Sequence, residues 1–296
     1  MEDTAVTQVW NIWDGAMTLG EGPAWDTLRN VLWFTDIKQK RVHCFDPCAG
    51  SVKSWNAPSQ IGWVLPASDG HLIAGLQKGL ARFDPDEGTF RSITEVESEL
   101  PHNRLNDATV APDGTIWFGS MDDLETDRSG RFYRWDGNAV RDIGLAPVCI
   151  TNGPALSLDA SKLYYVDTAA GIIHVASLDA LGDVQDTRVF AQIDPNDGHP
   201  DGCIVDTRGN VWVGLWGGWR ARLYSPDGSI LQEVRLPAAN VTKIALGGVD
   251  RTTAYATTAR AGLSDEELMD QPEAGSIFAF KVDIPGIQIG PARAPA

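Results

Sequence analysis

The amino-acid sequence predicts an all-β protein, a six-bladed β-propeller with four-stranded blades. Its apolar segments are short, rich in β-branched and aromatic residues, and separated by Asp-Gly or Asn-Gly-like turns, as in chains built from β-hairpins. A hydrophobic strand recurs six times along the 296 residues, at intervals of 40 to 48 residues. A repeat of this length that contains several strands is typical of propeller blades.

The recurring strand identifies the six blades in order. Its copies begin at Leu32, Leu72, Ile116, Leu163, Val211 and Ala254. Further apolar segments follow them, at residues 41–45, 80–83, 131–135, 172–176, 221–224 and 276–280. The strand-like residues 6–13 have no repeat of their own. We expect them to join the last blade and close the ring, because this pairing removes two exposed sheet edges.

Two segments near the C-terminus differ from the repeats. Residues 264–269 are the one convincing helical stretch, since Ser264 and Glu267 match a capping box. The segment from Pro285 onward is rich in Pro, Gly and Ala, and we expect it to fray. No linker divides the sequence, so a single domain over residues 1–296 is predicted.

The composition limits the partners and the compartment. With Lys+Arg 24 and Asp+Glu 40, the net charge is −16, which opposes binding to nucleic acid or to an anionic membrane. The four cysteines lack zinc-finger spacing and suit a reducing compartment. The first residues do not resemble a signal peptide, and no run of about 18 apolar residues exists. We expect a cytoplasmic protein, as a monomer or a small homo-oligomer.

Four polar residues precede the recurring strand at nearly the same offset. Counting ten or eleven residues back from its start gives Glu21, Asn106, Asn152 and Asp201. The one-residue variation is what a turn differing by one residue produces. Equivalent positions on the innermost strands of a propeller converge around one axis. Two carboxylates and two amides form an oxygen ligand set that suits Ca²⁺, Mg²⁺ or Mn²⁺.

Other interpretations of these positions stay open. Asn and Asp often begin strands by satisfying turn backbone, although four at one offset favour a site. In the sixth copy the offset gives Lys243, which either balances the carboxylates, forms a salt bridge or takes part in catalysis. His199 either shuttles a proton or is an ordinary loop residue. Trp216 and Trp219 either wall a pocket or pack between blades, and Cys203 is expected to pack within its strand.

Several motifs carry a family resemblance over nearly the whole length. These are Leu-Gly-Glu-Gly-Pro at 19–23, Arg-Leu-Asn-Asp at 104–107, Ile-Thr-Asn-Gly-Pro at 150–154, Pro-Asp-Gly at 200–202 and Asn-Val-Thr-Lys at 240–243. The sequence resembles the SMP-30/gluconolactonase/regucalcin family of six-bladed lactonases. Leu-Trp-Gly-Gly at 215–218 and Thr-Thr-Ala-Arg at 257–260 are similar, more narrowly, to bacterial xylonolactonase-type enzymes.

The resemblance implies a metal site and its ligands. In this family a Glu, an Asn and an Asp hold one divalent ion (calcium, zinc, manganese or ferrous iron), and they correspond to Glu21, Asn152 and Asp201. Asn106 then lies beside the metal, and Arg104 contacts substrate hydroxyls. Some animal members place a glutamate in the loop after the third inner strand, where the best-aligned residue of this sequence is Leu124.

The expected function is therefore metal-dependent opening of a sugar lactone, an aldono-1,4- or 1,5-lactone, to the aldonic acid, in oxidative pentose or hexose catabolism. Asp201 is our candidate general base, because one carboxylate oxygen can bind the metal while the other accepts a proton. Two alternatives remain. One is another metal-dependent ester or phosphotriester hydrolase, and the other is a non-catalytic calcium-binding propeller.

Overall fold

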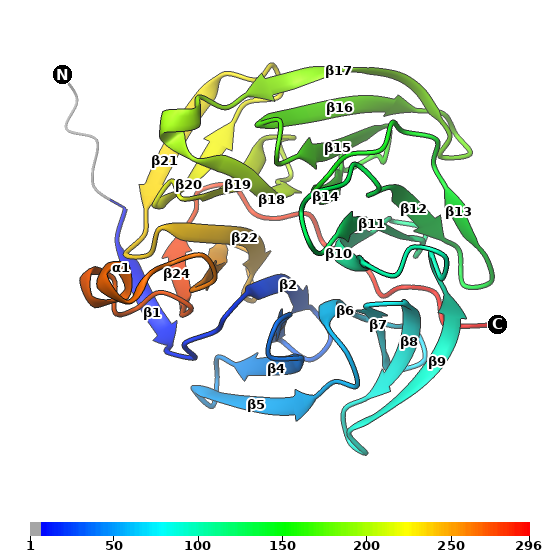
Figure 1. The fold of residues 1–296 in the computed structure, drawn as a ribbon, viewed down its shortest axis with the longest axis horizontal. Helices are drawn as coiled ribbons and strands as arrows, with labels where there is room; N and C mark the ends of the chain where they lie inside the picture. Colours follow the sequence, from blue (N-terminus) through cyan, green and yellow to red (C-terminus); the bar gives the residue numbers. More distant parts are fainter. Residues whose placement is uncertain (1–6) are drawn as a thin grey trace.

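Residues 7–296, the part described by the computed structural model, form six four-stranded antiparallel sheets arranged as blades around a central axis (Figure 1). In blades 1 to 5 the strands lie in chain order from the axis outward. The predicted six-bladed β-propeller is confirmed.

Each blade has four strands, named from the innermost to the outermost. Blades 1 to 3 contain β2 (Gly20–Asp26), β3 (Val31–Asp36), β4 (Arg41–Asp46) and β5 (Ser51–Asn56); β6 (Ile61–Pro66), β7 (Leu72–Leu76), β8 (Gly79–Asp84) and β9 (Thr89–Glu95); and β10 (Asn103–Val110), β11 (Ile116–Asp122), β12 (Phe132–Trp135) and β13 (Val140–Asp142). Blades 4 to 6 contain β14 (Thr151–Leu156), β15 (Lys162–Asp167), β16 (Ile172–Leu178) and β17 (Val184–Gln192); β18 (His199–Val205), β19 (Val211–Trp216), β20 (Arg220–Tyr224) and β21 (Ile230–Arg235); and β22 (Asn240–Gly247), β23 (Thr253–Ala259), β24 (Ile277–Lys281) and β1 (Val9–Trp13).

The N-terminal strand closes the ring as predicted. β1 pairs antiparallel with β24, with Val9 opposite Phe280 and Trp10 opposite Ala279. Residue 6, the first of the predicted strand, lies outside the described residues. Blade 6 therefore combines the first strand of the chain with the last three, so its outermost strand comes from the other end of the sequence.

Helical structure within residues 7–296 is confined to α1 (Asp265–Asp270) and the 3-10 helix η1 (Pro195–Asp197). The predicted capping box is present, since the Ser264 side chain accepts from the backbone of Glu267 and the Glu267 side chain accepts from the backbone of Ser264. Neither helix is long and apolar enough to cross a membrane.

The core lies between neighbouring blades. The tryptophans of the recurring strand are buried, with Trp33, Trp117 and Trp212 no more than 4% exposed. Trp212 of β19 packs against Phe280 of β24, with ring centroids 5.6 Å apart, and both belong to one cluster that spans blades 5 and 6. Because apolar side chains join adjacent sheets, each blade is held by its two neighbours rather than by its own sheet alone.

The C-terminal segment does not fray as expected. From Pro285 it runs along the base of the propeller, the face turned away from the viewer in Figure 1. Pro285 accepts hydrogen bonds from Thr207 of blade 5, Ala292 donates to Pro66 of blade 2, and Ala296 donates to Gly137 of blade 3. The prediction from composition was wrong. A segment rich in Pro, Gly and Ala is still ordered when turns of several blades provide hydrogen-bond partners for its backbone.

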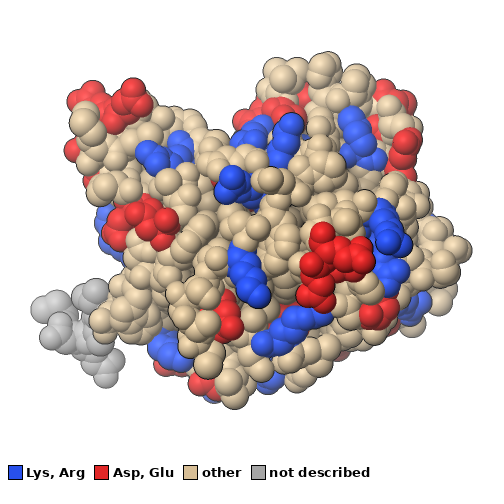
Figure 2. All heavy atoms as spheres, turned by 90° about the horizontal axis from the view of Figure 1, so that it is seen from below, with Lys and Arg blue, Asp and Glu red and all other residues tan. Residues whose placement is uncertain are grey.

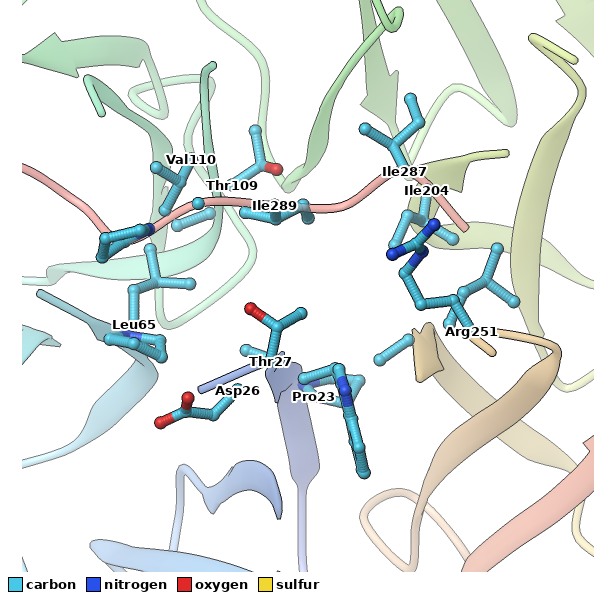
Figure 3. Close-up of a pocket in the computed structure, with 18 of the residues that line it drawn as sticks. Pro23, Asp26, Thr27, Leu65, Thr109, Val110, Ile204, Arg251, Ile287 and Ile289 are labelled. Carbon is cyan, nitrogen blue, oxygen red and sulfur yellow. The ribbon is translucent and has the colours of Figure 1, made fainter. Parts of the chain in front are cut away.

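The same segment covers the base of the central channel. Ile287 and Ile289 line a small cavity there together with Pro23, Thr109 and Ile204 from the inner strands (Figure 3). Ala292 is fully buried. The channel is therefore covered on this side by the chain's own last residues.

Candidate metal and active site

The inner strands that carry the predicted site residues share one irregularity in their pairing. Register shifts occur between Glu21 and Ala24 in β2 and between Asn152 and Ala155 in β14. The equivalent shifts lie between Leu105 and Ala108 in β10 and between Pro200 and Cys203 in β18. Irregularities of this kind bend a strand and redirect its side chains.

The register shows how four blades supply one site. Glu21 and Asn152 are the last paired residues before the irregularity, whereas Asn106 and Asp201 are the first residues within it. The four predicted residues therefore occupy two neighbouring positions on their strands rather than one.

The structure brings the four side chains together and buries them. All are 3–5% exposed. A hydrogen bond links the carboxyl groups of Glu21 and Asp201. Asn106 Nδ2 donates to Asn152 Oδ1 at 3.0 Å, and Asn152 Nδ2 donates to Thr168 Oγ1 at 2.9 Å. Arg104 connects the two pairs, since its charge acts on Glu21 and its Nη1 donates to Asn106. We refer to residues 21, 106, 152 and 201 together as the polar cluster.

Without a cation, burial favours the protonated forms of the carboxyl groups of Glu21 and Asp201. Burial raises the pKa of Glu21 to about 8, and the charge of Asp107 acts in the same direction. Burial also raises the pKa of Asp201 well above its ordinary value, with further contributions from the charges of Glu21 and Asp107. Two adjacent buried carboxylates repel each other unless a proton or a cation lies between them.

The donor set fits a hard divalent cation. Among residues 7–296 no three His, Cys, Asp or Glu side chains form a metal-binding group by themselves, so amide oxygens have to complete the set. Glu21, Asp201 and the oxygen of Asn152 supply two carboxylates and one amide, which are ligand types that Ca²⁺ and Mn²⁺ accept. A cation bound in this cluster would compensate the two carboxylate charges in place of protons.

Metal-free protein is expected to lose stability as the pH rises from about 4.5 to about 8. The pKa of Glu21 is about 8 in the folded state and has the ordinary value of 4.5 in the unfolded chain. Between these pH values the folded state keeps a proton that the unfolded chain has released. The folded state thus binds more protons, and the free energy of unfolding falls with rising pH, by up to about 1.4 kcal/mol per pH unit for one proton. Urea denaturation of metal-free protein across this range measures the slope. Glu21→Gln should reduce the slope, because Asp201 keeps its own raised pKa, and a flat wild-type curve would contradict the assignment.

Arg104 lies beside the cluster. Its Nη1 donates to Asn106 Oδ1 at 2.5 Å, and its Nε donates to Asp123 Oδ1 at 2.6 Å. Among the described residues its Nη2 makes no hydrogen bond, which leaves this amino group for a ligand. Leu124 is exposed, so the carboxylate that the loop turns inward comes from the neighbouring Asp123.

Lys243 forms a buried ion pair, one of the roles that its place in the repeat left open. Its Nζ lies 2.5 Å from Asp107 Oδ1 and donates to the carbonyl of Ala108 at 3.1 Å. Asp107 in β10 and Lys243 in β22 stand at the same register position of opposite blades, so the pair crosses the channel. A Cβ at Gly202 would lie 2.6 Å from Lys243 Cγ, so only glycine admits the lysine stem at this point.

The remaining candidates lie outside the polar cluster. His199 is exposed at the start of β18, opposite Trp216. Trp216 packs partly buried against Leu19, Ile37 and Ala259 of blades 1 and 6. Trp219 is half-buried, and its backbone bonds to blade 6 at Ala239. Cys203 is buried in a core cluster with Ala155 and Tyr164, as expected.

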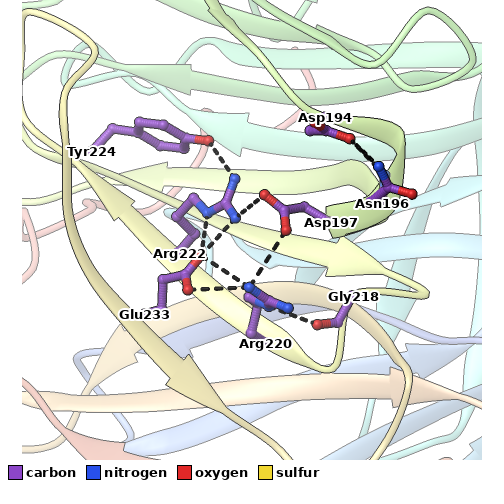
Figure 4. Close-up of polar contacts among 8 residues, drawn as sticks. All are labelled: Asp194, Asn196, Asp197, Gly218, Arg220, Arg222, Tyr224 and Glu233. Atoms are coloured by element: carbon purple, nitrogen blue, oxygen red, sulfur yellow. Dashed lines mark hydrogen bonds and ion pairs between the residues drawn. The ribbon is translucent and has the colours of Figure 1, made fainter.

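A network of ion pairs holds the loops of blade 5 that flank Asp201 (Figure 4). Arg222 contacts Asp197 of η1 at 2.6 Å and Glu233 of β21 at 2.6 Å. Arg220 donates to the carbonyl of Gly218 at 2.8 Å. The segments before Asp201 and after Trp216 are therefore tied to the outer strands of the same blade.

The cluster lies near the start of the inner strands, whereas the C-terminal segment bonds at or beyond the ends of such strands, at Pro66 and Thr207. The face opposite the C-terminal segment is turned toward the viewer in Figure 1 and forms the upper edge in Figure 2, where a hollow divides it. The long connections 123–131 and 260–276, the second of which contains α1, lie on this face. The opposite end of the channel is the one covered by the C-terminal segment.

Several residues that contact the site were not predicted from the sequence. Asp107, Asp123 and Thr168 each contact one of the predicted residues or Lys243. A signal existed for Asp107, because it is the last residue of the Arg-Leu-Asn-Asp motif at 104–107. No repeat pattern marks Asp123, which follows β11 in a loop of irregular length.

Comparison with known proteins places the chain among sugar-lactone enzymes and regucalcins. The SMP-30/Gluconolactonase/LRE-like region matches residues 19–260. An L-arabinolactonase of Azospirillum brasilense is 37% identical over 90% of this chain and 89% of its own. A 6-deoxy-6-sulfogluconolactonase of Pseudomonas putida is 33% identical over 90% of this chain and 92% of its own.

The fold comparison agrees with these sequence matches. The crystal structure of a calcium-binding protein, regucalcin, from Agrobacterium tumefaciens superposes with a TM-score of 0.92, at 26% identity, over 97% of each chain. The family motifs lie on the inner strands that carry the buried cluster. The chain belongs to the SMP-30/gluconolactonase/LRE-like family.

Proposed function

We propose that this protein is a metal-dependent lactonase that opens a sugar lactone, an aldono-1,4- or 1,5-lactone, to the aldonic acid in pentose or hexose catabolism. The observation that carries the proposal is the buried cluster of Glu21, Asn106, Asn152 and Asp201, which four blades supply. The related L-arabinolactonase and 6-deoxy-6-sulfogluconolactonase support the substrate class.

Glu21, Asn152 and Asp201 are the proposed metal ligands. A divalent cation held there supplies a Lewis acid that polarises the lactone carbonyl. The similarity to a calcium-binding regucalcin supports a divalent ion, and the family resemblance leaves calcium, manganese, zinc and ferrous iron as candidates.

The residues around the proposed cation site have two further roles, proton transfer and orientation of the substrate. Asp201 accepts the proton of the attacking water at one carboxylate oxygen, and general-base assistance of this kind typically contributes about 10²–10⁴ in rate. The new C–O bond forms as the ring C–O bond breaks, and the proton passes to the ring oxygen that leaves as a hydroxyl. Arg104 and Asn106 orient the sugar hydroxyls, for which Arg104 Nη2 is available.

The test is metal analysis of the purified protein followed by a hydrolysis panel. The panel contains a pentono-1,4-lactone, a hexono-1,5-lactone and an aryl ester, each with and without chelator, and spontaneous hydrolysis is subtracted. We expect a bound divalent ion and lactone turnover that chelation removes. Turnover of the aryl ester alone would indicate a different ester hydrolase. A bound ion without any turnover would indicate a calcium-binding protein.

A further inference from the structure

The carboxylate of Asp123, at the rim of the channel, accepts hydrogen bonds from side chains of three blades. Asp123 Oδ1 accepts from Lys38 Nζ of blade 1 at 2.7 Å and from Arg104 Nε of blade 3 at 2.6 Å. Asp123 Oδ2 accepts from Gln60 Nε2, which precedes blade 2, at 2.9 Å. Neither the sequence motifs nor the proposed mechanism assigns this residue a role.

Asp123 is connected to the proposed metal ligands through Arg104. The Arg104 side chain is 4% exposed, and its Nε contact with Asp123 sets the position of the guanidinium. The same guanidinium donates through Nη1 to Asn106 Oδ1 at 2.5 Å. An arginine side chain has donors only, so the atom of Asn106 that faces it has to be the oxygen.

The orientation of Asn106 then determines the orientation of Asn152. With its oxygen on Arg104, Asn106 Nδ2 donates to the carbonyl of Thr151 at 2.6 Å and to Asn152 Oδ1 at 3.0 Å. Asn152 Nδ2 is turned to Thr168 Oγ1 at 2.9 Å. Asn152 therefore presents its oxygen, which keeps a second lone pair for a cation, rather than its nitrogen.

We propose that Asp123 is a positioning residue of the metal site: by holding Arg104 it fixes which way the amides of Asn106 and Asn152 point, and so which atom Asn152 offers to the cation. The proposal rests on the proposed function. Residues that contact a metal ligand directly typically change metal affinity 10- to 100-fold when they are removed. Asp123 acts through Arg104 and Asn106, so we expect an effect at the lower end of this range. Lys38 contacts the same carboxylate but makes no contact with Arg104, which makes it a matched control.

The experiment is calorimetric titration of metal-free protein with Mn²⁺ and separately with Ca²⁺. We expect Asp123→Ala to bind about tenfold more weakly than the wild type, and Asp123→Glu to recover most of the affinity because it restores a charged acceptor. Lys38→Met, which removes a part-exposed ion pair, should change the affinity less than about fivefold. Asp123→Asn, of nearly the same size, serves if the alanine variant does not fold.

The outcomes separate this inference from the proposed function. If the wild type binds metal and hydrolyses lactones but a folded Asp123 variant binds metal equally well, the positioning role is wrong and the lactonase proposal stands. Equal losses in Asp123→Ala and Lys38→Met would also overturn it, because the effect would then follow the rim charge rather than Arg104. A wild type that binds no divalent ion, either in these titrations or in the metal analysis of the purified protein, would remove both proposals.

Discussion

Asp201→Asn is expected to keep the propeller fold and to lose about 10²–10⁴ of lactone turnover. Asparagine retains a side-chain oxygen for the metal but accepts no proton from water at neutral pH. The substitution also removes one of two adjacent buried acids, so the folded state should not become less stable. The measurement is kcat on the preferred lactone, with circular dichroism and melting temperature as checks of the fold.

Asn152→Ala is the matched control, because it removes a proposed ligand and leaves the proposed base. Turnover of this variant should recover as metal is added, since only the metal affinity is reduced. Turnover of Asp201→Asn should stay low at saturating metal. If Asp201→Asn also recovers, Asp201 is a ligand only, and the base is another group.

Lys243→Met is expected to lower the free energy of unfolding by about 3–5 kcal/mol. The substitution leaves Asp107 buried without its cation, close to Glu21 and Asp201. In the wild type, burial raises the pKa of Asp107 and the Lys243 ammonium lowers it. Without the ammonium the pKa rises further, so Asp107 takes up a proton more readily and the loss should shrink as the pH falls. Urea denaturation of the metal-free variant at two pH values tests both statements.

Two controls separate the buried pair from a general effect of charge. Lys38→Met removes an exposed lysine and should change stability by no more than about 0.5 kcal/mol. Adding Asp107→Asn to Lys243→Met should recover part of the loss, because the uncompensated carboxylate is gone. A single Lys243→Met variant as stable as the wild type would show that the pair does not stabilise the channel.

Most of the fold could be predicted because its causes are local and repeat. The spacing of Leu32, Leu72, Ile116 and their equivalents reflects one hairpin pattern used six times, which makes the period visible above local variation. The leftover N-terminal strand had one remaining partner, β24. The capping box of Ser264 is local as well. The C-terminal segment was misjudged because its order depends on turns in three other blades.

The candidate site was predictable in its members but not in its connections. Glu21, Asn106, Asn152 and Asp201 were found because a propeller converts a repeated sequence offset into a common place in space. Their two register positions became visible only through the pairing irregularities of the inner strands. Asp123 left no repeat signal, since loops on the rim vary in length from blade to blade.

The sequence by itself determined the blade number, the ring closure and the oxygen-rich cluster. The repeat period, the strand pattern and the residue types are properties of short segments, so they can be recognised without knowledge of tertiary contacts. Only the tertiary structure decided that Asp107 rather than a metal ligand pairs with Lys243, that Asp123 holds Arg104, and that the last residues cover the channel base. These are contacts between residues of different blades or loops. Their geometry depends on register shifts, blade packing and loop paths that no local pattern encodes.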